Sequence, residues 1–225
     1  MNKKFDLILF DLDGTIFDTT QTILNSLKAT IEKEGLRKLT DEEISTFIGP
    51  PIIDSLKKYY PELSDKEIDD LTKSYRQYYI DYELLKAKPF ENIPTVIKEL
   101  KNNNYKIALA TYKLMKCVTP LFDYYDFTKY FDTLRGSIAE KGISKTEIMK
   151  LAMDDCGVLN PDRVCMIGDT EHDLRGAINL NVSFLAVSYG SGIKNVTKEE
   201  LNYKKFLGTV NNAIKILDII WNNIF

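Results

Sequence analysis

Histidine, tryptophan and cysteine are scarce in this sequence of 225 residues, which has one histidine, one tryptophan and three cysteines. Cys117, Cys156 and Cys165 are an odd number, they lack the spacing of a metal site, and two of them fall inside apolar segments. Reduced, buried thiols of a cytoplasmic protein are therefore expected, in preference to a metal or redox role.

Long apolar runs and blocks of like charge are also missing. No uninterrupted apolar run approaches the roughly 18–20 residues that a membrane span requires. Charge interrupts the apolar part of the N-terminus, which argues against a secretion signal. The formal net charge is −3, so neither nucleic acid nor an anionic membrane is an expected partner. The composition, 44% hydrophobic and 28% charged, is that of a soluble globular protein, expected as a monomer or homodimer.

Four short apolar segments are mostly continuous, as in strands that are covered on both faces of a parallel sheet. Helix-length stretches lie between the later ones, and this alternation predicts an α/β core with a doubly wound, Rossmann-like parallel sheet. A closing helix with Trp221 packed against the core is expected at the C-terminus. The predicted strands are 5–10, 106–110, 164–168 and 182–188, and the predicted helices are about 92–103, 114–125, 144–156 and 171–180.

The region from about 17 to 88 has no such strand and carries helical signals throughout. Capping boxes begin at Thr40 and Ser64, and "GPP" at 49–51 is a helix stop and turn. We therefore expect an all-helical domain, a candidate cap, inserted after the first strand of the core. The expected boundaries are 1–16 and 86–225 for the core and 17–85 for the helical insert.

Carboxylates and a hydroxyl follow three of the predicted strands. Asp11 and Asp13 follow the first, Thr111 the second, and Asp169 the third, with Asp173 one helical turn further on. Ligands of open α/β sheets bind at the carboxyl ends of the strands, so these side chains are expected to converge. Several carboxylates in one crevice repel one another unless a cation is present. Their oxygen donors favour Mg²⁺ over zinc.

Two further features indicate an anion beside that cation. Gly14 allows backbone amides to approach a bound anion, and Thr15 adds a hydroxyl donor. Ser144 and Glu147 form a capping box that places Lys145 in the first turn of a helix. A cation there is unfavourable in the helix dipole unless it faces an anion.

The sequence resembles the haloacid dehalogenase superfamily, and in particular its phosphoglycolate-phosphatase and nucleotidase-like branch. The resemblance rests on "DLDGT" at 11–15, on Thr111, on Lys145 at a helix start and on "GDTEHD" at 168–173. It covers essentially the whole chain, because the helical insert stands where these proteins carry a cap of the helical (C1) kind. The branch is suggested by "FIGPPIIDSL" at 47–56 and "RGSIAEKGISKTEIM" at 135–149.

The resemblance implies a Mg²⁺-dependent phosphatase that acts on a small phosphorylated metabolite. Asp11 would be the nucleophile that forms an aspartyl-phosphate, and Asp13 the general acid and base. Thr111 and Lys145 would complete the catalytic set by binding phosphoryl oxygens. The implied metal ligands are Asp11, Asp13 through its backbone carbonyl, Asp169 and Asp173, the last as a direct ligand or a partner of one. The implied substrate- and phosphate-binding residues are Gly14, Thr15, Gly49, Pro50, Thr111, Lys113 and Lys145.

Some alternatives stay open at this stage. A phosphomutase of the β-phosphoglucomutase kind uses the same core residues, and a phosphate-binding regulatory protein could have lost the chemistry. His172, the sole histidine, is more simply an exposed helix residue than a catalytic base. Tyr112 replaces the small polar residue often found beside Thr111 in such phosphatases, which affects the expected substrate contacts. The tyrosines of the insert are expected to pack in its core and on its surface rather than to stack on a nucleobase.

Overall fold

The computed structural model describes residues 3–48, 50–137, 143–190, 192–193 and 197–222 of the chain. Internal contacts divide the chain into two compact units. One unit, the core, joins Met1–Asp18 with Pro89–Phe225, and the other, the helical unit, is Thr19–Lys88. The expected helical insert, 17–85, begins and ends a few residues earlier than this unit.

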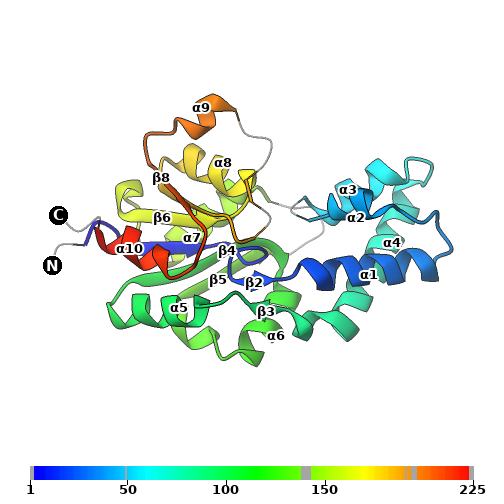
Figure 1. Cartoon of the computed structure of the whole chain (residues 1–225), viewed down its shortest axis with the longest axis horizontal. Helices are drawn as coiled ribbons and strands as arrows, with labels where there is room; N and C mark the ends of the chain where they lie inside the picture. The colour runs from blue at the N-terminus through cyan, green and yellow to red at the C-terminus, as the bar shows by residue number, and fades with distance from the viewer. Residues whose placement is uncertain (1–2, 49, 138–142, 191, 194–196, 223–225) are drawn as a thin grey trace. The chain divides into compact units, whose positions relative to one another are not determined.

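The core is built on a six-stranded parallel sheet with the strand order β5-β4-β1-β6-β7-β8 (Figure 1). The most N-terminal strand, β1, is therefore central, with β4 on one side and β6 on the other. Phe10, its last residue, lies opposite Leu109 of β4 and Ile167 of β6, so β1 and β6 end within one residue of each other. β4 continues to Leu114, so Thr111, which was expected to follow this strand, lies within it. The strands are β1 (Leu7–Phe10), β4 (Lys106–Leu114), β5 (Thr133–Ser137), β6 (Val164–Gly168), β7 (Ser183–Val187) and β8 (Phe206–Val210).

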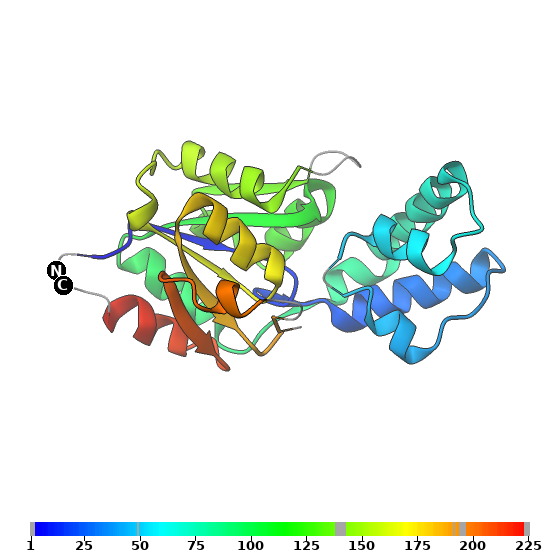
Figure 2. The same cartoon turned by 90° about the horizontal axis from the view of Figure 1, so that it is seen from above.

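Helices cover both faces of this sheet, which explains the continuous apolar sequence of its central strands. Helices α7 and α8 contact one face, and α5, α6 and α10 lie on the other (Figure 2). The doubly wound architecture expected from the sequence is thus confirmed. The helices of the core are α5 (Ile93–Asn102), α6 (Met115–Tyr124), α7 (Lys145–Asp155), α8 (Glu171–Leu180), α9 (Lys198–Leu201) and α10 (Lys215–Asn222).

The hydrophobic core beneath α7 and α8 is formed by alternate residues of the strands, because successive side chains of a strand point to opposite faces. Leu7 and Leu9 of β1 and Ala108 and Ala110 of β4 all belong to it and are fully buried. Tyr112 continues the β4 series and packs, partly buried, against the same cluster. The residue after Leu9 in the β1 series is Asp11, so the strand directs this carboxylate towards the α7 side.

Two strands of the sheet, β5 and β8, were not expected from the sequence. They are its edges, and their sequences, "TLRGS" and "FLGTV", lack a continuous apolar run. An edge strand is only partly covered, so polar residues such as Arg135 and Thr209 are tolerated there. The four predicted strands are all present, and the expected closing helix is α10, in which Trp221 is partly buried.

The helical unit, taken by itself, encloses its own apolar core. Leu27 and Ile31 of its first helix are buried there together with Leu56 and Tyr60. The predicted capping boxes at Thr40 and Ser64 start α2 and α4, and Pro51 is the N-cap of α3. The helices are α1 (Thr20–Lys33), α2 (Asp41–Ser45), α3 (Ile52–Tyr59) and α4 (Asp65–Tyr78), followed by a π-helical turn (Tyr79–Glu83) and a 3₁₀ turn (Leu84–Lys86). Short strands β2 (Phe17–Asp18) and β3 (Lys88–Pro89) form a separate two-stranded sheet.

The tyrosines of the helical unit divide between its core and its surface. Tyr60, Tyr75 and Tyr79 are buried, whereas Tyr82 is 61% exposed. Tyr60 also donates a hydrogen bond to the Arg37 carbonyl, 2.8 Å away. The arrangement agrees with the expectation that these rings pack in the unit and on its surface.

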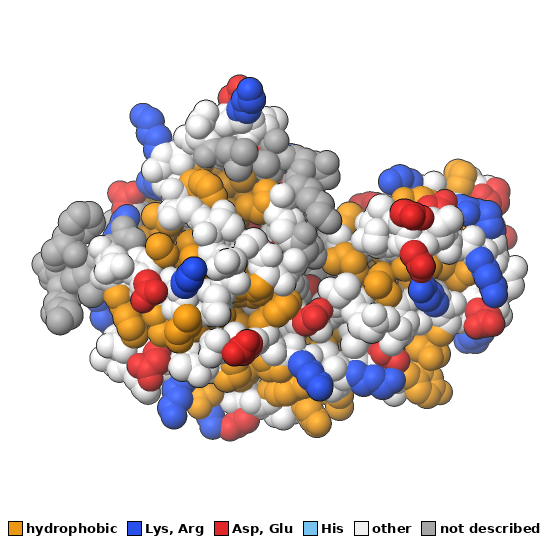
Figure 3. All heavy atoms as spheres, viewed as in Figure 1, with side chains coloured by type: hydrophobic (Ala, Val, Ile, Leu, Met, Phe, Trp, Pro, Cys, Tyr) orange, Lys and Arg blue, Asp and Glu red, His pale blue; other side chains and the backbone are white. Residues whose placement is uncertain are grey.

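Surface charge is mixed on the face drawn in Figure 3, where Lys and Arg side chains alternate with Asp and Glu. Within the part of the chain that the structure describes, no helix is both long and apolar enough to cross a membrane.

Candidate active site

A tight turn follows β1 and presents the first carboxylates. The Asp11 amide donates to the Ile167 carbonyl at 2.9 Å, which extends the pairing with β6 by one residue. The chain then folds back, because the Leu12 carbonyl accepts hydrogen bonds from the amides of Thr15, Ile16 and Phe17. Gly14 has a φ of +78°, a conformation that glycine adopts without the steric cost of a side chain. The turn thus brings two carboxylates to the end of the central strand.

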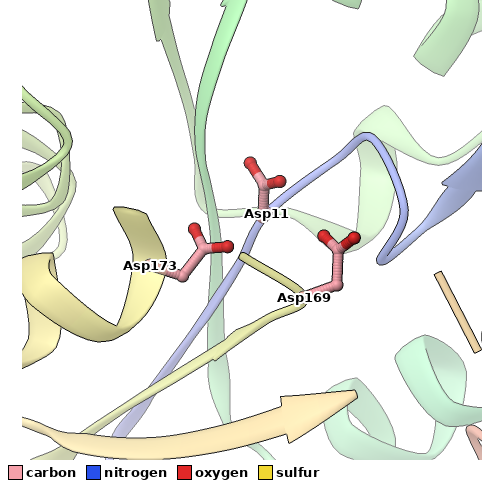
Figure 4. A group of neighbouring side chains, drawn as sticks. All are labelled: Asp11, Asp169 and Asp173. Carbon is pink, nitrogen blue, oxygen red and sulfur yellow. The ribbon is translucent and has the colours of Figure 1, made fainter. Parts of the chain in front are cut away.

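Three carboxylates from separate elements meet at this point. Asp11 follows β1, Asp169 follows β6, and Asp173 lies in the first turn of α8. Figure 4 shows their side chains grouped beside one another. One oxygen of each lies within 4.8 Å of the others, and all three residues are buried. The Thr15 hydroxyl adds a hydrogen bond to Asp169 Oδ1 at 3.2 Å. The carboxylates predicted from the sequence are therefore brought together, while the side chain of Asp13 is not part of this group.

Lys145 is the cation of the cluster. It is 4% exposed, and its Nζ lies 2.6 Å from Asp11 Oδ1 and 2.6 Å from Asp173 Oδ1. Asp173 Oδ2 accepts hydrogen bonds from the Thr170 amide at 3.0 Å and hydroxyl at 2.7 Å, so this carboxylate also caps α8. The predicted capping box of Ser144 and Glu147 is present and begins α7 at Lys145. The sequence correctly placed this lysine in the first helical turn, opposite an anionic partner.

Burial and the charges of the cluster shift the pKa values of Asp11 and Lys145. Burial raises the pKa of Asp11, and the neighbouring Asp173 adds to the rise, although the ammonium of Lys145 opposes it. Burial alone would lower the pKa of Lys145, but its ion pairs with Asp11 and Asp173 outweigh this and raise it. Three carboxylates and one ammonium leave two formal negative charges in a buried space, which a divalent cation would balance.

The donor set fits a hard divalent cation. All the side-chain donors of the cluster are oxygens, as Mg²⁺ prefers. The Asp169 carboxylate also packs directly against the turn after β1, since a Cβ on Gly14 would lie 2.1 Å from Asp169 Oδ2. Asp11, Asp169 and Asp173 are thus able to hold a metal ion at the end of the sheet.

Tyr189 and Gly190, which follow β7, hold the turn after β1 in place. The Tyr189 hydroxyl donates to the Thr15 carbonyl at 3.1 Å, and its ring packs on Phe90 with centroids 4.8 Å apart. Burial raises the pKa of Tyr189, so the hydroxyl keeps its proton at neutral pH. A Cβ on Gly190 would lie 1.9 Å from the Gly14 carbonyl oxygen, so only glycine fits there.

The end of β4 contributes three consecutive residues. Thr111 is buried, and its hydroxyl oxygen accepts a hydrogen bond from the Lys113 amide at 3.2 Å. The Lys113 Nζ lies 2.9 Å and 3.2 Å from the two carboxylate oxygens of Asp13. Tyr112, between them, accepts a hydrogen bond from the Lys145 amide at 3.0 Å. The strand therefore reaches both the carboxylate turn after β1 and the start of α7.

Some predicted residues do not belong to the described part of the core, and others have unexpected partners. Gly49 lies outside the described residues, and Pro50 is an exposed residue of the helical unit. His172 is partly buried, not exposed, because its ring packs edge-on against Tyr112 with centroids 5.4 Å apart. The contacts of Tyr112 and Tyr189 were not foreseen. Tyr112 lies within β4 beside Thr111, and Tyr189 lies two residues after the end of β7, and these positions were the available signal.

Comparison with known proteins places this site in a family. A family model described as "Haloacid dehalogenase-like hydrolase" matches residues 8–187, most of the chain. The chain therefore belongs to the haloacid dehalogenase-like hydrolases, as its motifs predicted.

The relatives narrow the class to phosphatases. Phosphoglycolate phosphatase of Aquifex aeolicus is 29% identical over 170 residues, which cover 75% of this chain and 78% of that protein. Pyrophosphatase PpaX of Bacillus cereus is 27% identical over 187 residues, 83% of this chain and 84% of the relative. A solved structure of a predicted phosphatase from Clostridium acetobutylicum is 26% identical, with a TM-score of 0.83 over 97% of this chain and 99% of that one. The protein is thus an enzyme of the phosphatase kind within this family.

Proposed function

We propose that the protein is a Mg²⁺-dependent phosphatase that hydrolyses a small phosphomonoester metabolite through an aspartyl-phosphate on Asp11. Phosphoglycolate-, nucleotide- and sugar-phosphate-like compounds are the substrate classes in view. The observation that carries the proposal is the buried Asp11 carboxylate, paired at 2.6 Å with Lys145 and grouped with Asp169 and Asp173. The family membership and the phosphatase relatives support it.

In the first half-reaction an Asp11 oxygen attacks phosphorus and the bond from phosphorus to the ester oxygen breaks. Asp13 gives its proton to the departing ester oxygen, which leaves as a neutral hydroxyl group. Asp13 is suited to this role because it is on the same turn as Asp11 and, unlike Asp11, is partly exposed to solvent.

In the second half-reaction a water molecule attacks the aspartyl-phosphate. Asp13, now ionised, takes a proton from that water, the bond between phosphorus and the Asp11 oxygen breaks, and inorganic phosphate is released. The Asp11 carboxylate and the Asp13 proton are both restored, so the cycle consumes only substrate and water.

The remaining residues of the site hold charge in place. The Lys145 ammonium neutralises Asp11 and is proposed to bind a phosphoryl oxygen with the Thr111 hydroxyl. Asp11, Asp169, Asp173 and the Asp13 carbonyl are proposed to hold Mg²⁺, which when bound supplies charge neutralisation for the phosphoryl group. Phosphoryl transfer depends mainly on positioning and electrostatic stabilisation, so this set is sufficient for the chemistry.

The helical unit, Thr19–Lys88, is proposed to act as the cap that supplies substrate specificity. The predicted roles of Gly49 and Pro50 belong to this part of the proposal, and the predicted contact of Lys113 with substrate belongs to the core. A cytoplasmic location and a monomeric or homodimeric state also stay predictions.

A panel of phosphorylated metabolites, pyrophosphate included, tests the proposal by phosphate release with and without MgCl₂. We expect Mg²⁺-dependent turnover of at least one phosphomonoester, reduced more than about 1,000-fold in Asp11→Asn. An acid-quenched reaction of the wild type should show the mass of one added phosphoryl group, which Asp11→Asn should lack. Asp154→Asn, an exposed carboxylate on α7, is the control and should retain activity.

Three other results would contradict the proposed phosphatase mechanism. Turnover that is undiminished in Asp11→Asn refutes the aspartyl-phosphate mechanism. Phosphoryl transfer to a sugar phosphate instead of water identifies a phosphomutase, and binding of phosphate without any turnover identifies a regulatory protein.

A further inference from the structure

Tyr112 makes contacts with Lys145 that a small polar residue at this position lacks the length to make. Its hydroxyl oxygen accepts a hydrogen bond from the Lys145 amide at 3.0 Å. The Lys145 Nζ lies 5.6 Å from the centroid of the same ring. Tyr112 therefore touches both the backbone and the charged end of one residue.

The hydrogen bond provides an acceptor for one of the backbone amides that have no partner at the start of every helix. Lys145 is the first residue of α7, and the amides of the first helical turn have no carbonyl partner within the helix. The side chain of the N-cap, Ser144, accepts from the Glu147 amide instead. The Tyr112 hydroxyl thus provides the Lys145 amide with a partner, and it ties the end of β4 to the beginning of α7.

The ring is itself held in place. Tyr112 follows Ala108 and Ala110 in the series of β4 side chains that face α7. It is partly buried and packs against the hydrophobic cluster to which these two alanines belong. The His172 ring lies edge-on to it at an interplanar angle of 83°, which is a favoured geometry for aromatic pairs. A side chain supported by the sheet on one side and by α8 on another is rigid enough to locate its neighbour.

We propose that Tyr112 is a positioning residue that fixes Lys145 so that its ammonium sits between Asp11 and Asp173. The ion pairs alone do not determine where the lysine sits, because its side chain has four rotatable bonds. The hydrogen bond fixes the backbone from which the side chain starts, and the aromatic face bounds the volume into which Nζ extends. The inference rests on the proposed function, in which Lys145 neutralises Asp11 and binds phosphate.

Tyr112→Phe and Tyr112→Leu separate the two contacts. Phenylalanine keeps the ring and loses the hydrogen bond, whereas leucine loses both. Tyr203→Phe is the matched control, because Tyr203 packs on the same cluster and its hydroxyl also bonds to the backbone, to the carbonyls of Ala177 and Val182.

Hydrogen exchange, kinetics and thermal unfolding are measured on each full-length variant. The first is amide hydrogen exchange of peptides within 143–150, which reports the start of α7 without any need for activity. The second is kcat and KM for p-nitrophenyl phosphate with MgCl₂, and the third is the midpoint of thermal unfolding.

We expect Tyr112→Phe to speed exchange at Lys145 and to lower kcat about tenfold, with KM changed less than about threefold. Leucine should lower kcat about 100-fold. Tyr203→Phe should lower the unfolding midpoint by a similar amount to Tyr112→Phe while leaving kcat and the exchange of 143–150 unchanged.

Exchange or kcat of Tyr112→Phe equal to that of Tyr203→Phe overturns the inference, because the tyrosine would then contribute stability alone. An effect confined to KM also overturns it, since it would place Tyr112 in substrate binding. If the wild type hydrolyses no phosphomonoester, the proposed function fails, while the exchange of 143–150 still decides whether Tyr112 holds Lys145.

Discussion

Lys113 and Asp13 form an ion pair in which Nζ lies 2.9 Å from one carboxylate oxygen and 3.2 Å from the other. The lysine side chain is only 9% exposed and that of the aspartate 31%. Lys113 was expected to reach the substrate. In the structure it holds the carboxylate proposed as the acid and base, and its expected contact with substrate stays a prediction.

Replacing this lysine should impair proton transfer. Lys113→Met keeps the length of the side chain but removes the charge that orients Asp13, and we expect kcat to fall about tenfold. Steady-state kinetics on p-nitrophenyl phosphate measures the change. Lys116→Met, an exposed lysine of the neighbouring helix α6, is the control. Activity of Lys113→Met within twofold of the wild type would contradict a role for the ion pair.

Magnesium should stabilise the folded protein through Asp169. Mg²⁺ at 100 times its Kd adds about 2.7 kcal/mol to the free energy of unfolding, which is about 5–10 °C in midpoint for a chain of this size. Thermal unfolding at increasing MgCl₂ measures this rise, and Asp169→Asn should abolish it. Asp154→Asn should keep it. A rise that survives in Asp169→Asn would place the metal elsewhere.

Alanine at Gly190 should disturb the site through the backbone. The added Cβ would lie 1.9 Å from the Gly14 carbonyl oxygen and 2.8 Å from Asp169 Oδ2, so the turn after β1 has to move. We expect a loss of about 3 kcal/mol in the free energy of unfolding and a fall in kcat of more than about 100-fold, measured by urea unfolding and kinetics.

Gly157→Ala is the control for this substitution. Gly157 has a φ of +64° but nothing within 4 Å of a Cβ, so it carries a conformational cost of about 1 kcal/mol and no clash. Its activity should be unchanged. Equal kinetic effects of the two substitutions would show that the close approach at Gly190 is unimportant.

The pair between Arg135 and Asp155 should make stability depend on pH. Hydrogen bonds from Arg135, with Nε at 2.5 Å and Nη2 at 2.6 Å, lower the pKa of Asp155. A lowered pKa means that the stabilisation is complete above the pKa of the unfolded state and is lost as pH falls through the folded value. Asp155→Asn should therefore cost about 1 kcal/mol at pH 7, because the pair is partly exposed, and progressively less towards pH 3.

Urea unfolding of wild type and Asp155→Asn between pH 7 and pH 3 measures that difference. The exposed pair of Lys150 and Asp154 provides the comparison, and Asp154→Asn should change stability little at any pH. A difference between wild type and Asp155→Asn that stays constant with pH would assign the effect to lost packing and not to charge.

The sequence predicted the central part of the fold because burial leaves a pattern. The strands that form β1, β6 and β7 are buried along their whole length and read as continuous apolar runs. The edge strand β5 has the sequence "TLRGS", and its Arg135 pairs with Asp155 of α7. No local pattern therefore marks this segment as a strand. Edge strands are specified by the neighbours they pair with, and these neighbours are distant in sequence.

The site was predictable for residues at strand ends and helix starts, but not for the partners of long side chains. The order of Asp11, Lys145 and Asp169 along the chain, each at the end of a strand or the start of a helix, was enough to bring them together. The partners of long side chains were not predictable, because Lys113 and Tyr112 are adjacent yet bond to Asp13 and Lys145, on different elements. Such contacts depend on the direction in which each strand residue points and on the register between elements.

The central position of β1 also sets an order of assembly during synthesis. β1 leaves the ribosome first, but its neighbours β4 and β6 are made much later, and Thr15 and Asp169, which share a hydrogen bond, are 154 positions apart. At about 5–20 residues per second, roughly 8 to 30 seconds separate the two. The helical unit draws its core from one continuous stretch and has all its residues within that interval. A nascent chain arrested before Asp169 would thus carry the helices of the helical unit but lack two of the three carboxylates that meet at the end of β1.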